Sequence, residues 1–218
     1  MDPKTALYRK LAKAGAIAGI LVVLMYFLSK ITSLPEGIYY SLHIYQGPIM
    51  IFGWIGIYAF FRLKGQSIVL VTAIVFAVIS AVARMMFLVV QINNLVFIGE
   101  YKEAASPELK ETWNHILKGV FTVQNGLNIT SDIFLDLTII LFGIVCWNYN
   151  RIGKILAIYA FIGGGLHFIF KAYTFPKPPA TEGLFDAGPI AAMWPFIAAI
   201  WILTSLYMDK KIAQPNNV

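Results

Sequence analysis

Six long apolar stretches, separated by short polar segments, constrain this chain more than any other feature. A helix that crosses the ~30 Å hydrocarbon core of a membrane needs about 20 mostly apolar residues. Backbone polar groups in lipid must be satisfied within the segment, so each stretch is predicted to be a helix. The predicted spans are 10–32, 38–63, 67–98, 113–149, 154–173 and 190–208. We therefore predict an all-α, polytopic membrane helix bundle with six transmembrane helices.

The composition favours a membrane protein over a soluble one. Apolar residues make up 59% of the chain and charged residues 13%, against about 45–50% and 25% in soluble domains. The 218 residues are little more than six spans with their connections, so residues 1–218 are predicted to form one membrane domain. The net charge of +6 comes from basic residues at helix ends and predicts no nucleic-acid partner. Cys146, the single cysteine, allows neither a disulfide within the chain nor a cysteine-based metal site.

The basic residues predict an orientation, because cytoplasmic connections carry an excess of Lys and Arg. With the N-terminus inside, ten Lys and Arg residues lie at cytoplasmic ends and six lie outside among acidic residues. Both termini are therefore predicted to be cytoplasmic. The spans 67–98 and 113–149 are over-long, so we expect both to extend on the outer side, joined by a cap at 99–112. A Pro-rich loop at 174–189 is predicted to lie outside as well.

Two acidic residues and one basic residue fall deep inside the predicted spans. A lone charge at the bilayer centre costs at least ~2.5–3.5 kcal/mol on insertion scales. Counting helix rise places Arg84 and Asp132 at the midplane, so we predict an Arg84–Asp132 ion pair that either holds two helices in register or lines a site. Asp136 lies one turn (~5.4 Å) nearer the cytoplasm. Having no evident partner at that depth, it is expected to take up a proton, to hold a cation or to face a wet crevice.

Further polar side chains extend outward from the two acids along one helical face, at a spacing of four residues. The preceding span, 67–98, also carries amide side chains between Arg84 and its outer end. Because buried amides in lipid need hydrogen-bond partners, these side chains predict a polar cavity between the two spans that opens outward. The candidate residues for ligand binding or ion coupling on these spans are Arg84, Gln91, Asn94, Gln124, Asn128, Asp132 and Asp136.

Two histidines and a lysine are predicted near the outer ends of two other spans. His43 and His167 lie at similar depths by helix rise, and Lys171 follows His167 by one turn. They either line the outer mouth of the cavity or belong to an interfacial belt of aromatic and snorkelling side chains. No cofactor is predicted, although equal depth would also suit a haem b held by His43 and His167. In the first span, Gly15 and Gly19 form a small-residue face that predicts helix–helix contact.

Three stretches resemble a known family: LAKAGAIAGILVVL after the basic start, ARMMFLVVQINNLVF at 83–97 and NRIGKILAIYAFIGGGLHFIF at 150–170. In these stretches, and in layout over nearly the whole chain, the protein resembles a bacterial family of six-span membrane proteins catalogued as a domain of unknown function. The resemblance implies a multi-pass protein of a bacterial inner membrane. It implies no activity, and it does not extend to Asp132, Asp136 or the 174–189 loop.

Three functions remain open on these features. The first is a protein that binds or transports a small polar or amphipathic ligand in the cavity, with Asp136 coupling it to a proton or cation. The second is a membrane enzyme acting on a lipid or a quinone-like molecule, which requires His43 and His167 to face one cavity with the carboxylates. The third is an accessory subunit of a membrane complex, and self-association into a homo-oligomer is compatible with all three. We favour the first, because the cavity is predicted from the intramembrane charges themselves.

Overall fold

The computed structural model describes residues 2–29, 34–177 and 179–213, and the regular structure within these ranges consists entirely of helices. Six of these helices are long and apolar enough to cross a membrane, which confirms the predicted all-α six-helix bundle. The long helices are α1 Pro3–Leu28, α2 Glu36–Arg62, α3 Ile68–Asn93, α5 Pro107–Trp147, α6 Arg151–Thr174 and α7 Gly188–Ala213. Three short elements complete the chain: η1 Asn94–Ile98, α4 Gly99–Ala104 and η2 Pro179–Glu182.

Three of the long helices begin at a polar residue that caps the first turn. The side chains of Asp2, Ser67 and Asn150 each accept a hydrogen bond from the backbone N–H three residues later, at 3.2, 3.1 and 3.2 Å. Each bond satisfies one of the donors that a helix start leaves unpaired. The first helix begins at Pro3, earlier than the predicted residue 10, and the predicted end of that span at Thr32 lies outside the described residues.

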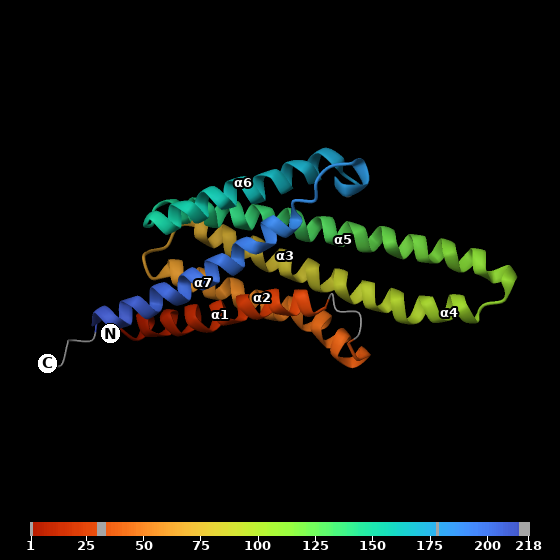
Figure 1. Cartoon of the computed structure of the whole chain (residues 1–218), viewed down its shortest axis with the longest axis horizontal. Coiled ribbons are helices and arrows are strands. Elements are labelled where there is room, and N and C mark those ends of the chain that lie inside the picture. The colour runs from red at the N-terminus through yellow and green to blue at the C-terminus, as the bar shows by residue number, and fades with distance from the viewer. Residues whose placement is uncertain (1, 30–33, 178, 214–218) are drawn as a thin grey trace.

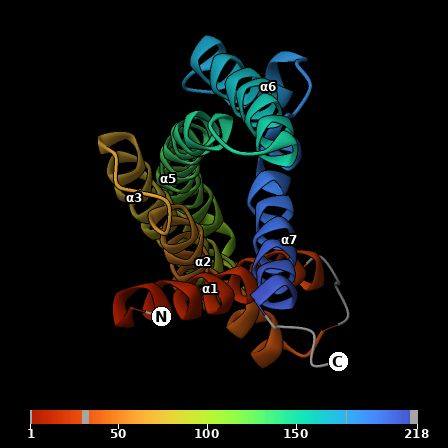
Figure 2. The ribbon, with the colours of Figure 1, turned by 90° about the vertical axis from the view of Figure 1, so that its left-hand side faces the viewer.

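The helices pack mostly against their neighbours in the chain. α1 packs along α2, α3 packs along α5, and α5 packs along α6, while α7 returns across the bundle to contact α1 and α6. Viewed end-on, α3 and α5 lie on one side and α7 on the other, with α6 above and α1 below (Figure 2). The start of α1 and the end of α7 lie together at what we call the terminal end, and the α4–α5 connection marks the opposite, hairpin end (Figure 1).

The helices α3 and α5 form a long antiparallel hairpin that projects past the rest of the bundle (Figure 1). The π-helix η1 continues α3 into α4 without a break, and α5 begins at Pro107 with Ser106 as its N-cap. Residues 99–112, predicted to form a cap, are therefore the tip of a helical hairpin. The fourth span begins at Pro107 rather than Trp113, because proline is well suited to the first turn of a helix.

The small-residue face of α1 is a contact surface, as predicted. A Cβ atom on Gly15 would collide with the Cα atom of Gly56 in α2, and one on Gly53 would lie 3.2 Å from the Cα atom of Gly19. Without Cβ atoms the two backbones approach closely, which is how small residues drive helix association in membranes. This contact fixes the crossing of α1 and α2.

An aromatic cluster fills the bundle on the terminal side of its centre. The rings of Trp54, Phe142 and Trp194 stack with centroids 5.6 to 6.4 Å apart, and all three side chains are buried. They come from α2, α5 and α7, so the cluster joins helices that are far apart in the sequence. Such ring pairs add about 0.5–1.5 kcal/mol each beyond the area they bury.

Candidate functional site

Two ion pairs join α5 to α6 in the interior of the bundle. We call Asp136–His167 the inner rung and Asp132–Lys171 the outer rung. The Nδ1 atom of His167 lies 2.9 Å from Oδ1 of Asp136, and Nζ of Lys171 lies 2.6 Å from Oδ2 of Asp132. The two acids are four residues apart on α5, and the two bases are four residues apart on α6. Since the helices are antiparallel, one register brings both pairs into contact. Asp136 is 0% exposed and His167 is 2% exposed, so both side chains of the inner rung are buried.

These rungs correct two predictions about the intramembrane charges. Asp132 forms its ion pair with Lys171 rather than with Arg84. Asp136 is not left without a partner, because His167 contacts it. The prediction placed His167 and Lys171 near the outer end of their span, either at the mouth of the cavity or in an interfacial belt, whereas the structure pairs both with the acids.

Reciprocal serine bonds set the register between α3 and α5. The hydroxyl of Ser80 donates to the carbonyl of Ser131 at 2.8 Å, and the hydroxyl of Ser131 donates to the carbonyl of Ser80 at 3.1 Å. This register places Arg84 level with Asn128, one turn from Asp132. The guanidinium of Arg84 accordingly donates to Oδ1 of Asn128 at 3.1 Å, and the amide of Asn128 reaches Oδ2 of Asp132 at 3.5 Å.

A cavity of about 590 Å³ lies in the middle of the bundle. All six long helices contribute to its wall, together with the segment between Pro179 and Pro189. Its volume falls within the ~300–1,000 Å³ typical of small-molecule sites. The predicted cavity therefore exists, but α1, α2, α6 and α7 line it as well as the two spans from which it was predicted.

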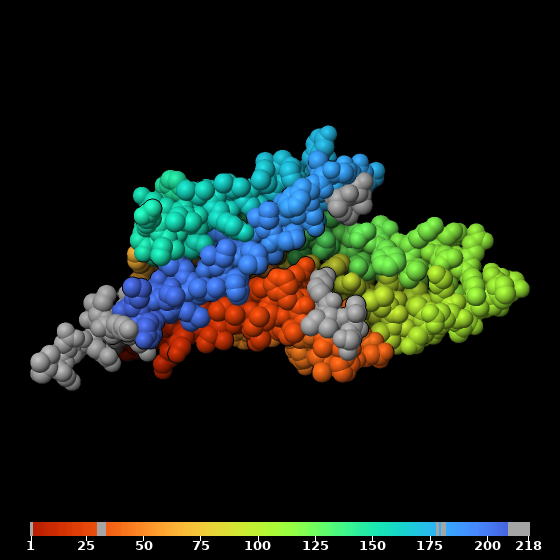
Figure 3. All heavy atoms as spheres, in the orientation of Figure 1, coloured from red at the N-terminus to blue at the C-terminus, as the bar shows by residue number. Residues whose placement is uncertain are grey.

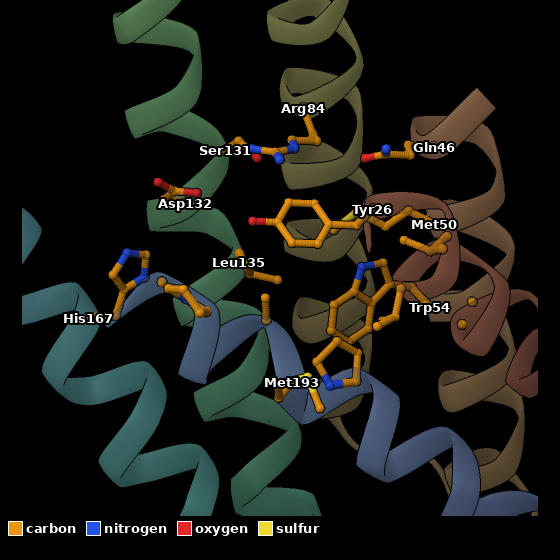
Figure 4. Close-up of a pocket in the computed structure, with 18 of the residues that line it drawn as sticks. Tyr26, Gln46, Met50, Trp54, Arg84, Ser131, Asp132, Leu135, His167 and Met193 are labelled. Carbon is orange, nitrogen blue, oxygen red and sulfur yellow. The ribbon is translucent and has the colours of Figure 1, made fainter. Parts of the chain in front are cut away.

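The cavity has a polar end and an apolar remainder. Figure 4 shows Tyr26, Gln46 and Arg84 reaching from α1, α2 and α3 toward the space that Asp132 faces from α5 and His167 from α6. The rest of the wall consists mainly of aliphatic, methionine and aromatic side chains, among them Met50, Trp54, Leu135 and Met193. A concave apolar site with a few convergent polar groups is the form that most ligand pockets take.

Two buried polar atoms at this site have no hydrogen-bond partner among the described residues. They are the indole Nε1 of Trp54, which is in the cavity wall, and Oδ2 of Asp136, directly behind His167. An unsatisfied buried donor or acceptor costs about 1–3 kcal/mol.

The segment after α6 covers the cavity toward the hairpin end. Pro179, Asp186 and Pro189 line the cavity from this segment, and Oδ1 of Asp186 accepts a hydrogen bond from the N–H of Gly188 at 3.0 Å. An exposed ion pair at 2.8 Å joins Lys177 to Glu182, and the hydrogen bond in that pair raises the pKa of Lys177. The Pro-rich loop is therefore a wall of the cavity.

Five predicted site residues do not line the cavity, and Asp136, which lies behind His167, is one of them. Gln91, Asn94 and Gln124 lie on the α3–α5 hairpin beyond the polar end, and Oδ1 of Asn94 and Oε1 of Gln124 are buried without a partner among the described residues. His43 is buried on α2, with its Nδ1 atom 2.8 Å from the carbonyl of Tyr39. His43 and His167 consequently do not share the cavity that the enzyme alternative requires.

Several residues of the site were not predicted, chief among them Tyr26, Gln46, Trp54 and Met193. Gln46 carried a usable signal, because a buried amide inside an apolar span needs a partner in the same way as the amides of α5. The others are ordinary residues for a membrane helix and become site residues only through packing. Within the described residues, no group of three or more His, Cys, Asp or Glu side chains is placed to hold a metal ion.

The fold and the cavity together define a class, a multi-pass helical membrane protein with an amphipathic cavity. No protein-family model, curated protein or solved structure matches the chain. The resemblance to a bacterial six-span family stays a prediction. The function must therefore be inferred from the site itself.

Proposed function

We propose that this protein binds a small amphipathic molecule in its central cavity, with both termini on the cytoplasmic side of a bacterial inner membrane. The supporting observation is the cavity of about 590 Å³, apolar over most of its wall and charged at one end. Charged side chains inside a membrane cost free energy, so they are rare there and commonly mark functional sites. A ligand with an apolar body and a polar head would match both parts of the wall.

Any coupling of binding to protons would involve His167 and Asp136 together. The two side chains share a hydrogen bond of 2.9 Å, and His167 lines the cavity while Asp136 stands behind it. A proton taken up by the pair would therefore reach the cavity through the imidazole. This replaces the earlier hypothesis in which Asp136 acts alone.

The test uses three single-chain amphiphiles of equal length, namely dodecanoate, 1-dodecanol and dodecylamine. The full-length protein is placed in nanodiscs of zwitterionic phospholipid, and its thermal unfolding midpoint is measured with each compound. We expect at least one of them to raise the midpoint, because a ligand at 100 times its Kd stabilises the folded state by about 2.7 kcal/mol. If none does so at any concentration that the nanodiscs tolerate, the proposal is wrong.

Two matched variants show whether the effect arises in the cavity. Met193→Trp fills part of the cavity, whereas Met86→Trp makes the same change on α3 at a side chain that is 49% exposed and outside the cavity wall. We expect the ligand-induced rise to disappear in Met193→Trp and to remain in Met86→Trp. Equal responses in the two variants would place the binding elsewhere.

A further inference from the structure

We infer that the head group of the ligand is a carboxylate held by Arg84. The inference rests on the proposed function and names the chemistry that the cavity selects. It begins from the partners of the charged side chains at the polar end. Asp132 and Lys171 contact each other at 2.6 Å, and Asp136 contacts His167 at 2.9 Å.

Among the charged side chains that the structure describes at this end, Arg84 is the one that forms no ion pair with a carboxylate. Among the described residues its hydrogen bond goes to the neutral amide of Asn128 at 3.1 Å, and its guanidinium also lies 5.0 Å from the ring centroid of Phe87. A guanidinium has five N–H donors, so most of its donors remain for a ligand. Arg84 lines the cavity and points into it (Figure 4).

The shape and charge of this side chain favour a carboxylate over other head groups. A guanidinium presents a planar fork that matches the two oxygens of a carboxylate, and such pairs are frequently bidentate. A phosphate monoester carries about −1.5 to −2 charges at neutral pH, more than one unmatched cation balances. An ammonium head would be repelled by Arg84, and Asp132 is already engaged by Lys171. The other carboxylate of the wall, Asp186, lies on the segment after α6 and accepts the N–H of Gly188.

A neighbouring polar side chain can donate a hydrogen bond, which suits a head group with acceptor oxygens. Gln46 lines the same end from α2, and its side-chain amide can donate to a bound oxygen. This amide adds a donor near an anion without adding negative charge.

The helices α1 and α7 both line the apolar remainder of the cavity. These helices touch where a Cβ atom on Gly19 would lie 3.4 Å from that of Ala199, and they diverge from there toward the hairpin end (Figures 1 and 3). The cavity-lining side chains Phe27 and Ala192 stand on the two sides of this divergence, and both are exposed. A single-chain carboxylic acid dissolved in the bilayer could pass between them with its head toward Arg84.

The experiment compares the same three amphiphiles at alkaline pH, where dodecanoate is ionised, in the native protein and three variants. We expect dodecanoate to bind about tenfold to a hundredfold more tightly than dodecanol, as expected for charge-assisted hydrogen bonds. Arg84→Gln should abolish this preference. Arg84→Lys should retain part of it, because lysine keeps the charge and loses the fork. Arg62→Gln, which removes an arginine at the end of α2 outside the cavity, should change nothing.

The inference is overturned if dodecanol binds as tightly as dodecanoate, if dodecylamine binds most tightly, or if the preference survives in Arg84→Gln. Should Arg84→Gln fail to fold, a full preference in Arg84→Lys would overturn the bidentate geometry. Binding of all three compounds with equal affinity, lost in Met193→Trp, would leave the proposed function standing and remove only the carboxylate. Failure of all three to bind would remove the proposed function as well.

Discussion

Asp136 and His167 face each other across the α5–α6 interface at 2.9 Å and are almost completely buried. We predict that breaking this pair destabilises the protein. Asp136→Leu should cost about 3–5 kcal/mol, because it leaves a buried polar group without its partner. The double variant Asp136→Leu/His167→Phe should recover part of that loss. Unfolding of the four proteins of this cycle in detergent measures the coupling, and additive losses would contradict a direct interaction.

The outer rung predicts a contrast between two lysines. Lys171 is 6% exposed and contacts Asp132, whereas Lys177 is 66% exposed and contacts Glu182. Lys171→Met should cost several kcal/mol because Asp132 loses its buried counter-charge. Lys177→Met should cost less than about 1 kcal/mol, as exposed ion pairs do. Comparable unfolding midpoints for the two variants would count against a buried ion pair at Lys171.

The close contact of α1 and α2 predicts different effects for two glycine substitutions. Gly15→Ala should destabilise the bundle, because the added methyl group would collide with the backbone of Gly56. Gly165→Ala on α6 should be neutral or slightly stabilising, since nothing lies within 4 Å of the position of its Cβ atom and alanine has the higher helix propensity. Unfolding midpoints of both variants in the same detergent test this, and the reverse order would disprove the contact.

The proposed orientation predicts which segments a membrane-impermeant thiol reagent reaches in intact cells. Cys146 is 0% exposed and should not react. Ser106→Cys, at the tip of the α3–α5 hairpin, should be labelled from outside. Gln66→Cys, in the α2–α3 connection, should be labelled only after the membrane is permeabilised. Labelling of Gln66→Cys alone in intact cells would invert the topology.

The helices could be predicted because hydrophobicity along the chain is a local property. In lipid, an apolar stretch of sufficient length has no alternative to a helix or a closed barrel. The ends of the helices were less accurate, as the starts at Pro3 and Pro107 show. The first turns of these two helices are polar and do not belong to the apolar stretch. A prediction from hydropathy alone therefore places the start of each helix too late in the chain.

The contact between Arg84 and Asn128 was also within reach of the sequence, by a different argument from the one used. Helix rise from an assumed midplane set Arg84 opposite Asp132. Hairpin geometry does better, because Arg84 and Asn128 are each 22 residues from Ser106 at the turn. Counted in the same way from Tyr149 in the α5–α6 turn, Asp136 is 13 residues away and His167 is 18 residues away. Equal distance from the turn therefore does not predict the α5–α6 ion pairs, which depend on how the two helices pack.

The sequence by itself determined that the chain forms six membrane-spanning helices, and that charged side chains lie within them. Both properties follow from residue type and from spacing along one helix. Only the tertiary structure decided that these side chains meet at one end of a cavity lined by all six long helices. Tyr26, Gln46 and Met193 reach that cavity from three helices that the polar pattern did not connect. Their convergence depends on how α1, α2 and α7 cross, which is set by close contacts such as Gly15 against Gly56, and those contacts link residues far apart in the chain.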